Sequence, residues 1–137
     1  MRMNNFSLKS ISLAWAGLSF AVSTGYAAEA YIVQPSDGAT VSSPVTVVFG
    51  LRGMGVAPAG VDQPNTGHHH LIIDAATPNL KMPIPKDKQH MHFGGGQTEV
   101  VLELTPGKHS LQMVLGDKAH IPHATPVVSQ KITIMVK

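Results

Sequence analysis

The feature that most limits the possible folds is the absence of helical periodicity after residue 27. Short runs of apolar and β-branched residues alternate instead with segments rich in glycine and proline. Such runs are typical of β-strands, and the intervening glycines and prolines are typical of turns and loops. Strands are therefore expected near Tyr31, at residues 45–51 and 68–74, weakly near Leu80, and at residues 98–104, 109–115 and 127–136.

Several short strands at regular spacing predict an all-β fold, an immunoglobulin-like antiparallel β-sandwich of about seven strands. The cysteines of antibody domains are missing, so the pattern predicts the architecture alone. The strands at residues 98–104 and 109–115, separated by a tight turn at 105–108, are expected to pair as a hairpin. About 110 residues suffice for one hydrophobic core, so residues 28–137 are expected to form a single domain.

The first 27 residues have the layout of a secretory signal peptide. Arg2 and Lys9 precede an apolar stretch at residues 11–22, and Gly25-Tyr26-Ala27 offers a small-x-small cleavage site. An uncleaved N-terminal anchor is the disfavoured alternative, because the apolar run is shorter than the roughly 20 residues that span a bilayer. We therefore expect a periplasmic or secreted protein that has no stable membrane span once the signal peptide is removed.

Composition argues against several classes of function. After the signal peptide the chain carries eight basic and eight acidic residues, and a neutral domain without a basic stripe is a poor binder of nucleic acid. The aromatic residues left there, Tyr31, Phe49 and Phe93, are too few to form stacking platforms. The chain has no cysteine, which excludes disulfides, thiolate metal ligands and cysteine nucleophiles.

Seven of the eight histidines are predicted to gather at one end of the sandwich. The loops between the second and third strands and between the last two strands lie at the same end of an immunoglobulin-like domain. The connection that leads into residues 98–104 must also reach that end. The histidines in these three places are His68, His69, His70, His90, His92, His120 and His123. His109 follows the turn at the opposite end.

The spacing of these histidines indicates which of them share a face. Alternate residues of a strand point to the same side, so His68 pairs with His70 and His90 pairs with His92. His69 then shares the side of Leu71 and is expected to be a packing residue, as is His109. Neutral imidazoles suit zinc and copper. The predicted metal ligands are His68, His70, His90, His92, His120 and His123.

A structural role competes with this interpretation. Imidazoles in loops also form hydrogen bonds with backbone carbonyl groups and stiffen irregular structure. For metal binding, Asp117 or Asp74 is the carboxylate expected to orient a ligand ring. The spacing alone does not decide between the two roles.

Seven of the eight histidines, all except His109, belong to three distinctive motifs, which read GHHHLIID at residues 67–74, HMHFGGGQT at 90–98 and GDKAHIPH at 116–123. In these motifs the chain resembles a family of small exported bacterial proteins that is catalogued as a domain of unknown function. The resemblance covers the chain from about Ala39 onward. It implies a periplasmic or secreted protein of a Gram-negative bacterium, and it supplies no activity.

Three functional hypotheses follow. The leading one is a non-enzymatic periplasmic domain that binds copper or zinc through the histidine-rich end. The second is a metal-free interaction module of the cell envelope, in which the histidines structure the loops and the loops contact an envelope protein or a glycan. The third, disfavoured, is a metal-dependent redox enzyme.

Overall fold

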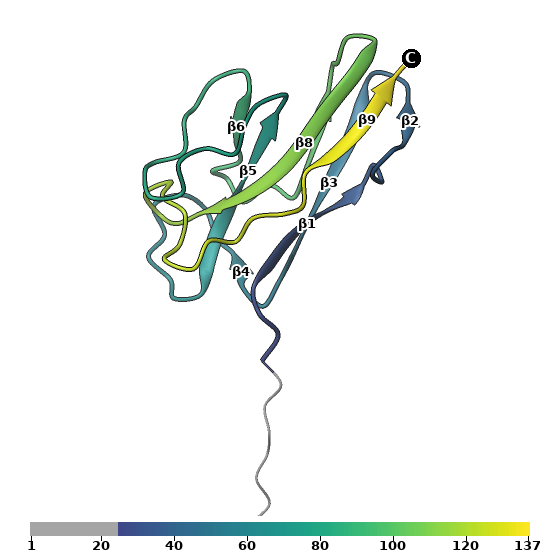
Figure 1. Cartoon of the computed structure of the whole chain (residues 1–137). Helices are drawn as coiled ribbons and strands as arrows, with labels where there is room; N and C mark the ends of the chain where they lie inside the picture. The colour runs from purple at the N-terminus through teal and green to yellow at the C-terminus, as the bar shows by residue number, and fades with distance from the viewer. Residues whose placement is uncertain (1–24) are drawn as a thin grey trace, which may run out of the picture.

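The structure is a computed structural model that describes residues 25–137, and this part of the chain is all-β. Figure 1 shows two layers of strands, with β1 and β3 in one layer and β5, β8 and β9 in the other. Most of the predicted signal peptide lies outside the described residues, so its cleavage and the domain boundary at residue 28 stay predictions. Within residues 25–137 there is no helix long and apolar enough to span a membrane.

Residues 25–137 contain nine strands. They are β1 (Glu29–Gln34), β2 (Thr40–Val41), β3 (Val45–Arg52), β4 (Gly55–Val56), β5 (Thr66–Ile73), β6 (His90–His92), β7 (Glu99–Leu102), β8 (Gly107–Gly116) and β9 (Ile132–Val136). The smaller sheet has the order β1-β3-β7, and the larger sheet has the order β2-β9-β8-β5-β4, with β6 also paired to β5. The predicted β-sandwich is therefore confirmed, although β2–β9 and β4–β5 are parallel pairs.

Two local predictions are wrong. The segment near Leu80 is not a strand, since the prolines around it withhold ladder hydrogen bonds, and residues 90–92 pair with β5 instead. The predicted hairpin does not form either, because β7 pairs with β3 while β8 pairs with β5 and β9. Leu102 and Leu111 both face the core, but from opposite sheets. The chain therefore crosses between the layers at residues 103–106.

The core lies between the sheets and follows the two-residue period of the strands. In β9, Ile132, Ile134 and Val136 are buried, whereas Met135 between them is exposed. Val47 and Phe49 of β3 meet this face from the other sheet. Burial of alternate apolar side chains supplies the main stabilisation of such a sandwich.

Strand β5 is buried on both of its faces. Leu71 and Ile73 belong to the main core, whereas Ile72 packs with Ile84 and Val114 in a second apolar cluster on the outer side of the larger sheet. The loop between β5 and β6 covers that outer side, and the backbone N–H of Ile84 donates to the carbonyl oxygen of His120 at 2.8 Å. In Figure 1 this loop and the loop after β8 gather beside β5 and β6. The two loops therefore shield the side chains on the outer face of β5 from solvent.

His69 lies on the core face of β5, as its spacing predicts. Its ring is 1% exposed and packs 5.3 Å from the Phe49 ring, centroid to centroid. Neither ring nitrogen has a hydrogen-bond partner among the described residues. Burial lowers the pKa of His69 to about 4, so the ring is neutral at neutral pH.

Replacing His69 by leucine should stabilise the fold. A buried polar group without a partner destabilises a protein by roughly 1–3 kcal/mol, and leucine has a similar volume. We expect His69→Leu to raise the free energy of unfolding by about 1–2 kcal/mol in urea titrations with chelator present. His123→Leu is the control and should destabilise, because the His123 Nε2 atom bonds the Thr66 carbonyl oxygen at 2.9 Å. A loss of stability in His69→Leu would contradict the expectation.

His109 lies at the opposite end of the domain and forms a separate polar contact. Its Nδ1 atom is 2.7 Å from the Asp74 carboxylate, and its Nε2 atom is 2.8 Å from the Thr105 carbonyl oxygen. Both partners are acceptors, so both ring nitrogens carry protons in this arrangement. The hydrogen bond to Thr105 and then that to Asp74 raise the pKa of His109.

The contribution of His109 to stability should depend on pH. Its folded pKa lies above the unfolded value near 6.5, so the stabilisation is complete below that value and is lost as pH rises through the folded pKa. We expect His109→Gln to cost about 1 kcal/mol at pH 6 and close to nothing at pH 9, measured by urea unfolding of both proteins. An equal loss at both pH values would show that the charge of the ring contributes nothing.

Candidate metal centre

Four imidazole rings meet on the outer face of the larger sheet. His68 and His70 come from β5, His92 from β6 and His120 from the loop after β8. One ring nitrogen from each lies within 4.8 Å of those of all the others. His68 and His70 are buried, and His92 and His120 are partly buried. The cluster joins three separate parts of the sequence.

Strand register places three of the four rings. His68 and His70 are two residues apart in β5, so their side chains share the outer face. In the antiparallel ladder His92 of β6 lies directly opposite His70, and the two rings stack with centroids 5.3 Å apart and planes inclined by 24°. A shift of one residue in either strand would move these rings to opposite faces.

A tight turn presents the fourth ring. The Asp117 carboxylate accepts hydrogen bonds from the backbone N–H groups of Ala119 and Ile121, at 2.8 and 3.0 Å. Between these residues His120 adopts a left-handed conformation with φ of 64°, which is uncommon for a residue other than glycine. The His120 Nδ1 atom then lies 2.9 Å from the His68 Nε2 atom. Asp117 therefore positions His120 through the backbone, not through the ring as predicted.

Two glycines leave room for the rings. A Cβ atom on Gly94 would lie 2.5 Å from the His92 Nε2 atom, and one on Gly116 would lie 2.6 Å from the His70 Cε1 atom. Both distances are shorter than any normal contact, so neither position accepts a larger residue without a shift of the ring. Neither glycine was predicted as a site residue, although each stands beside a histidine motif in the sequence.

The electrostatics of the cluster favour neutral rings. Burial, followed by repulsion from the neighbouring histidines, lowers the pKa of His68 to about 4 and that of His70 to about 3. Burial also lowers the pKa of His92, with smaller contributions from His120 and Lys86. A neutral imidazole has a free nitrogen lone pair and is the form that binds metals.

Several ring nitrogens of the cluster lack a partner. Within the described part of the chain the His68 Nδ1, His70 Nδ1 and His92 Nε2 atoms are buried and form no hydrogen bond. Buried polar atoms in native proteins are almost always satisfied, so atoms of this kind indicate water or an ion. The cluster therefore has ring nitrogens that are not engaged in hydrogen bonds within the protein and could bind a water or an ion.

The spacing of the rings suits a single ion after a small contraction. A tetrahedral zinc ion with Zn–N distances near 2.0–2.1 Å needs its nitrogens about 3.3 Å apart. The His68–His120 pair is already at 2.9 Å, and no separation exceeds 4.8 Å. The widest pair must close by up to about 1.5 Å and the His68–His120 pair must open slightly, and side-chain rotations of His92 and His120 can supply both changes. The cluster can hold one metal ion.

The other histidines lie outside the cluster. His90 bonds the Asp87 carboxylate through its Nδ1 atom at 2.8 Å, and His123 bonds the backbone of Thr66. The structure thus brings together four of the six predicted ligands and gives His90 and His123 hydrogen-bonding partners. Asp74, the other predicted orienting carboxylate, contacts His109 instead of a cluster ring.

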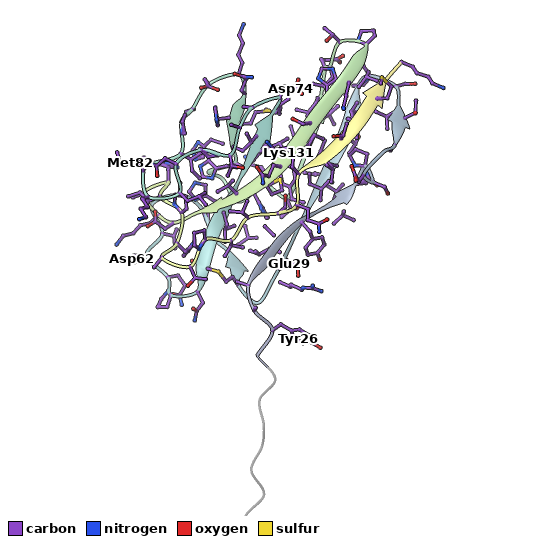
Figure 2. The ribbon with its side chains drawn as sticks, in the orientation of Figure 1. Tyr26, Glu29, Asp62, Asp74, Met82 and Lys131 are labelled. Atoms are coloured by element: carbon purple, nitrogen blue, oxygen red, sulfur yellow. The ribbon has the colours of Figure 1, made fainter. Side chains whose placement is uncertain are left out.

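One hollow of the described surface lies away from the cluster. A shallow basin of about 510 Å³ lies over Asp74, His109 and Lys131. Figure 2 shows Asp74 and Lys131 well apart from Met82, which belongs to the loop that covers the outer face of β5. Three of its polar side chains are already engaged, since Asp74 bonds His109 and the Lys131 ammonium group bonds the Ala75 carbonyl oxygen at 2.8 Å. The histidine cluster is the better candidate site.

Residues 47–137 match the model of one protein family, described as "Domain of unknown function (DUF4399)". The chain belongs to this family. All four cluster histidines, Asp117 and both glycines lie within the matched residues. Comparison with the curated proteins gave no match. Comparison with the solved structures gave none either.

The fit of the rings against the glycines can be tested by adding one methyl group. We expect Gly94→Ala to displace the His92 ring, to change its ring-nitrogen chemical shifts and to destabilise the fold by about 1–2 kcal/mol. Gly95→Ala is the matched control, because its Cβ atom would approach only the exposed side chain of Gln97, at 2.9 Å. Equal His92 spectra in the two variants would contradict the packing argument.

Proposed function

We propose that this DUF4399 protein is a non-enzymatic metal-binding domain of the periplasm that holds one copper or zinc ion in its four-histidine cluster. The observation that carries the proposal is the convergence of His68, His70, His92 and His120, whose ligand atoms all lie within 4.8 Å of one another. Lowered pKa values that keep His68, His70 and His92 neutral support the same role.

The donor chemistry narrows the choice of metal. Four neutral nitrogens and no thiolate suit Zn²⁺ and Cu²⁺, whereas Mg²⁺ and Ca²⁺ prefer oxygen ligands. Affinities in nitrogen sites generally rise toward Cu²⁺ and fall again at Zn²⁺. We therefore expect Cu²⁺ to bind more tightly than Zn²⁺ when the two are compared directly.

The periplasmic part of the proposal rests on the N-terminal sequence. Arg2, Lys9, the apolar residues 11–22 and the small residues around Ala27 form the pattern of a cleaved signal peptide. Histidine sites that use no thiolate also tolerate an oxidising compartment, since imidazole does not form disulfides. Export and metal binding are thus chemically compatible.

Metal titration of the untagged protein, purified after export, tests the site. We expect one Cu²⁺ or Zn²⁺ per chain at micromolar affinity or better, and a melting temperature that rises with free metal because the ion binds only the folded state. His70→Ala and His92→Ala should each weaken metal binding by at least about 100-fold. Each removes a direct ligand, whereas removal of a group that only hydrogen-bonds a ligand typically weakens binding by roughly 10- to 100-fold. Isothermal titration calorimetry measures both quantities.

The remaining histidines provide matched controls. His90→Ala and His123→Ala remove imidazoles close in sequence to the cluster but outside it, so the affinity should stay within a few-fold of the parent protein. A protein that binds neither metal, or one in which His90→Ala and His92→Ala lose affinity equally, would contradict the proposal. A melting temperature independent of metal would favour the envelope interaction module.

A further inference from the structure

A small cavity adjoins the histidine cluster on one side. It has a volume of about 160 Å³ and is lined by His70, His92 and His120 together with residues 83–86. His68, the remaining ring of the cluster, does not line it and is fully buried. The cluster therefore has a closed side at His68 and an accessible side at the cavity.

The wall opposite the three rings is part of the loop between β5 and β6. Ile84 is buried and anchored by its hydrogen bond to the His120 carbonyl oxygen, whereas Pro83, Pro85 and Lys86 are exposed. The prolines restrict the backbone of this wall. The cavity therefore has a conformationally restricted wall, which is hydrogen-bonded to the loop that carries His120, and it opens to solvent.

Positive charge borders the opening. Lys86 lines the cavity, and its charge is close enough to His92 to contribute to the lowered pKa of that ring. In the described region the Lys86 ammonium group forms no ion pair, whereas Lys118 pairs with Asp62. A divalent ion held by four neutral rings would add two further charges that these ligands do not neutralise. The cavity would thus attract an anion.

We propose that the metal ion keeps one coordination position toward this cavity and that a small inorganic anion binds there, with Lys86 as its counter-charge. This inference rests on the proposed metal site. The size of the ligand follows from the volume, since 160 Å³ is below the roughly 300–1,000 Å³ of pockets for drug-sized molecules. Four histidines fill the tetrahedral positions of zinc, so the position toward the cavity is a fifth one, which the tetragonal geometry of Cu²⁺ or a five-coordinate zinc ion provides.

Azide is a suitable probe, because it is a small anion and its binding to Cu²⁺ produces a charge-transfer absorption. We expect azide titration of the Cu²⁺-loaded protein to give a saturable new absorption band and a changed electron paramagnetic resonance spectrum. Lys86→Met should raise the azide dissociation constant about two- to fivefold, the size expected for one solvent-exposed charge. Lys88→Met, two residues along the same loop, should leave it unchanged.

The outcomes separate the two proposals. Stoichiometric Cu²⁺ binding with no spectral response to azide overturns the anion site and leaves the metal site intact. Equal azide affinity in Lys86→Met and Lys88→Met overturns the role assigned to Lys86. A protein that does not bind Cu²⁺ overturns the metal site and, with it, the anion site. Saturable azide binding that Lys86→Met alone weakens supports the inference.

Discussion

The structure depends on strand β5 being enclosed on every side. Its backbone pairs with β8 along most of its length and with β4 and β6 along shorter stretches. Its core face carries His69 and Leu71, and its outer face carries His68, His70 and Ile72. A strand held in this way has one register, because a slip of one residue would exchange its two faces. The position of the histidine cluster is therefore fixed by the same hydrogen bonds that hold the larger sheet together.

The cluster imposes its own constraint on the fold. Burial and repulsion from neighbouring rings penalise the charged form and lower the pKa values of His68, His70 and His92. The surroundings match this requirement, since the rings lie against glycines, an apolar patch around Ile84 and one another. The only close hydrogen bond between two cluster rings, in the described residues, joins His68 to His120. The site thus has ring nitrogens that no internal hydrogen bond uses, and the lone pairs of neutral imidazoles favour an added cation.

Sequence reasoning predicted the architecture and the shared face of His68 and His70, because the two-residue period of a strand is visible in residue order alone. It also placed His69 in the core. It could not separate His92 from His90, since both occupy the same face of β6 and the difference arises from Asp87, which engages His90. His120 and His123 differ for a similar reason, a turn built by Asp117. The prediction of a hairpin between residues 98–104 and 109–115 was wrong. The sequence of a tight turn does not indicate whether the next strand pairs in the same sheet or enters the other sheet.

The distribution of the four ligands along the chain has a consequence for the unfolded state. His68 and His120 are 52 residues apart in sequence, and His92 lies between them. An ion that holds all three would act as a reversible cross-link that closes two long loops at once. In the chain-entropy description, such closure disfavours the unfolded ensemble by an amount that grows slowly with loop length. A cysteine-free protein would thereby gain from a metal the kind of cross-link that many small domains obtain from disulfides.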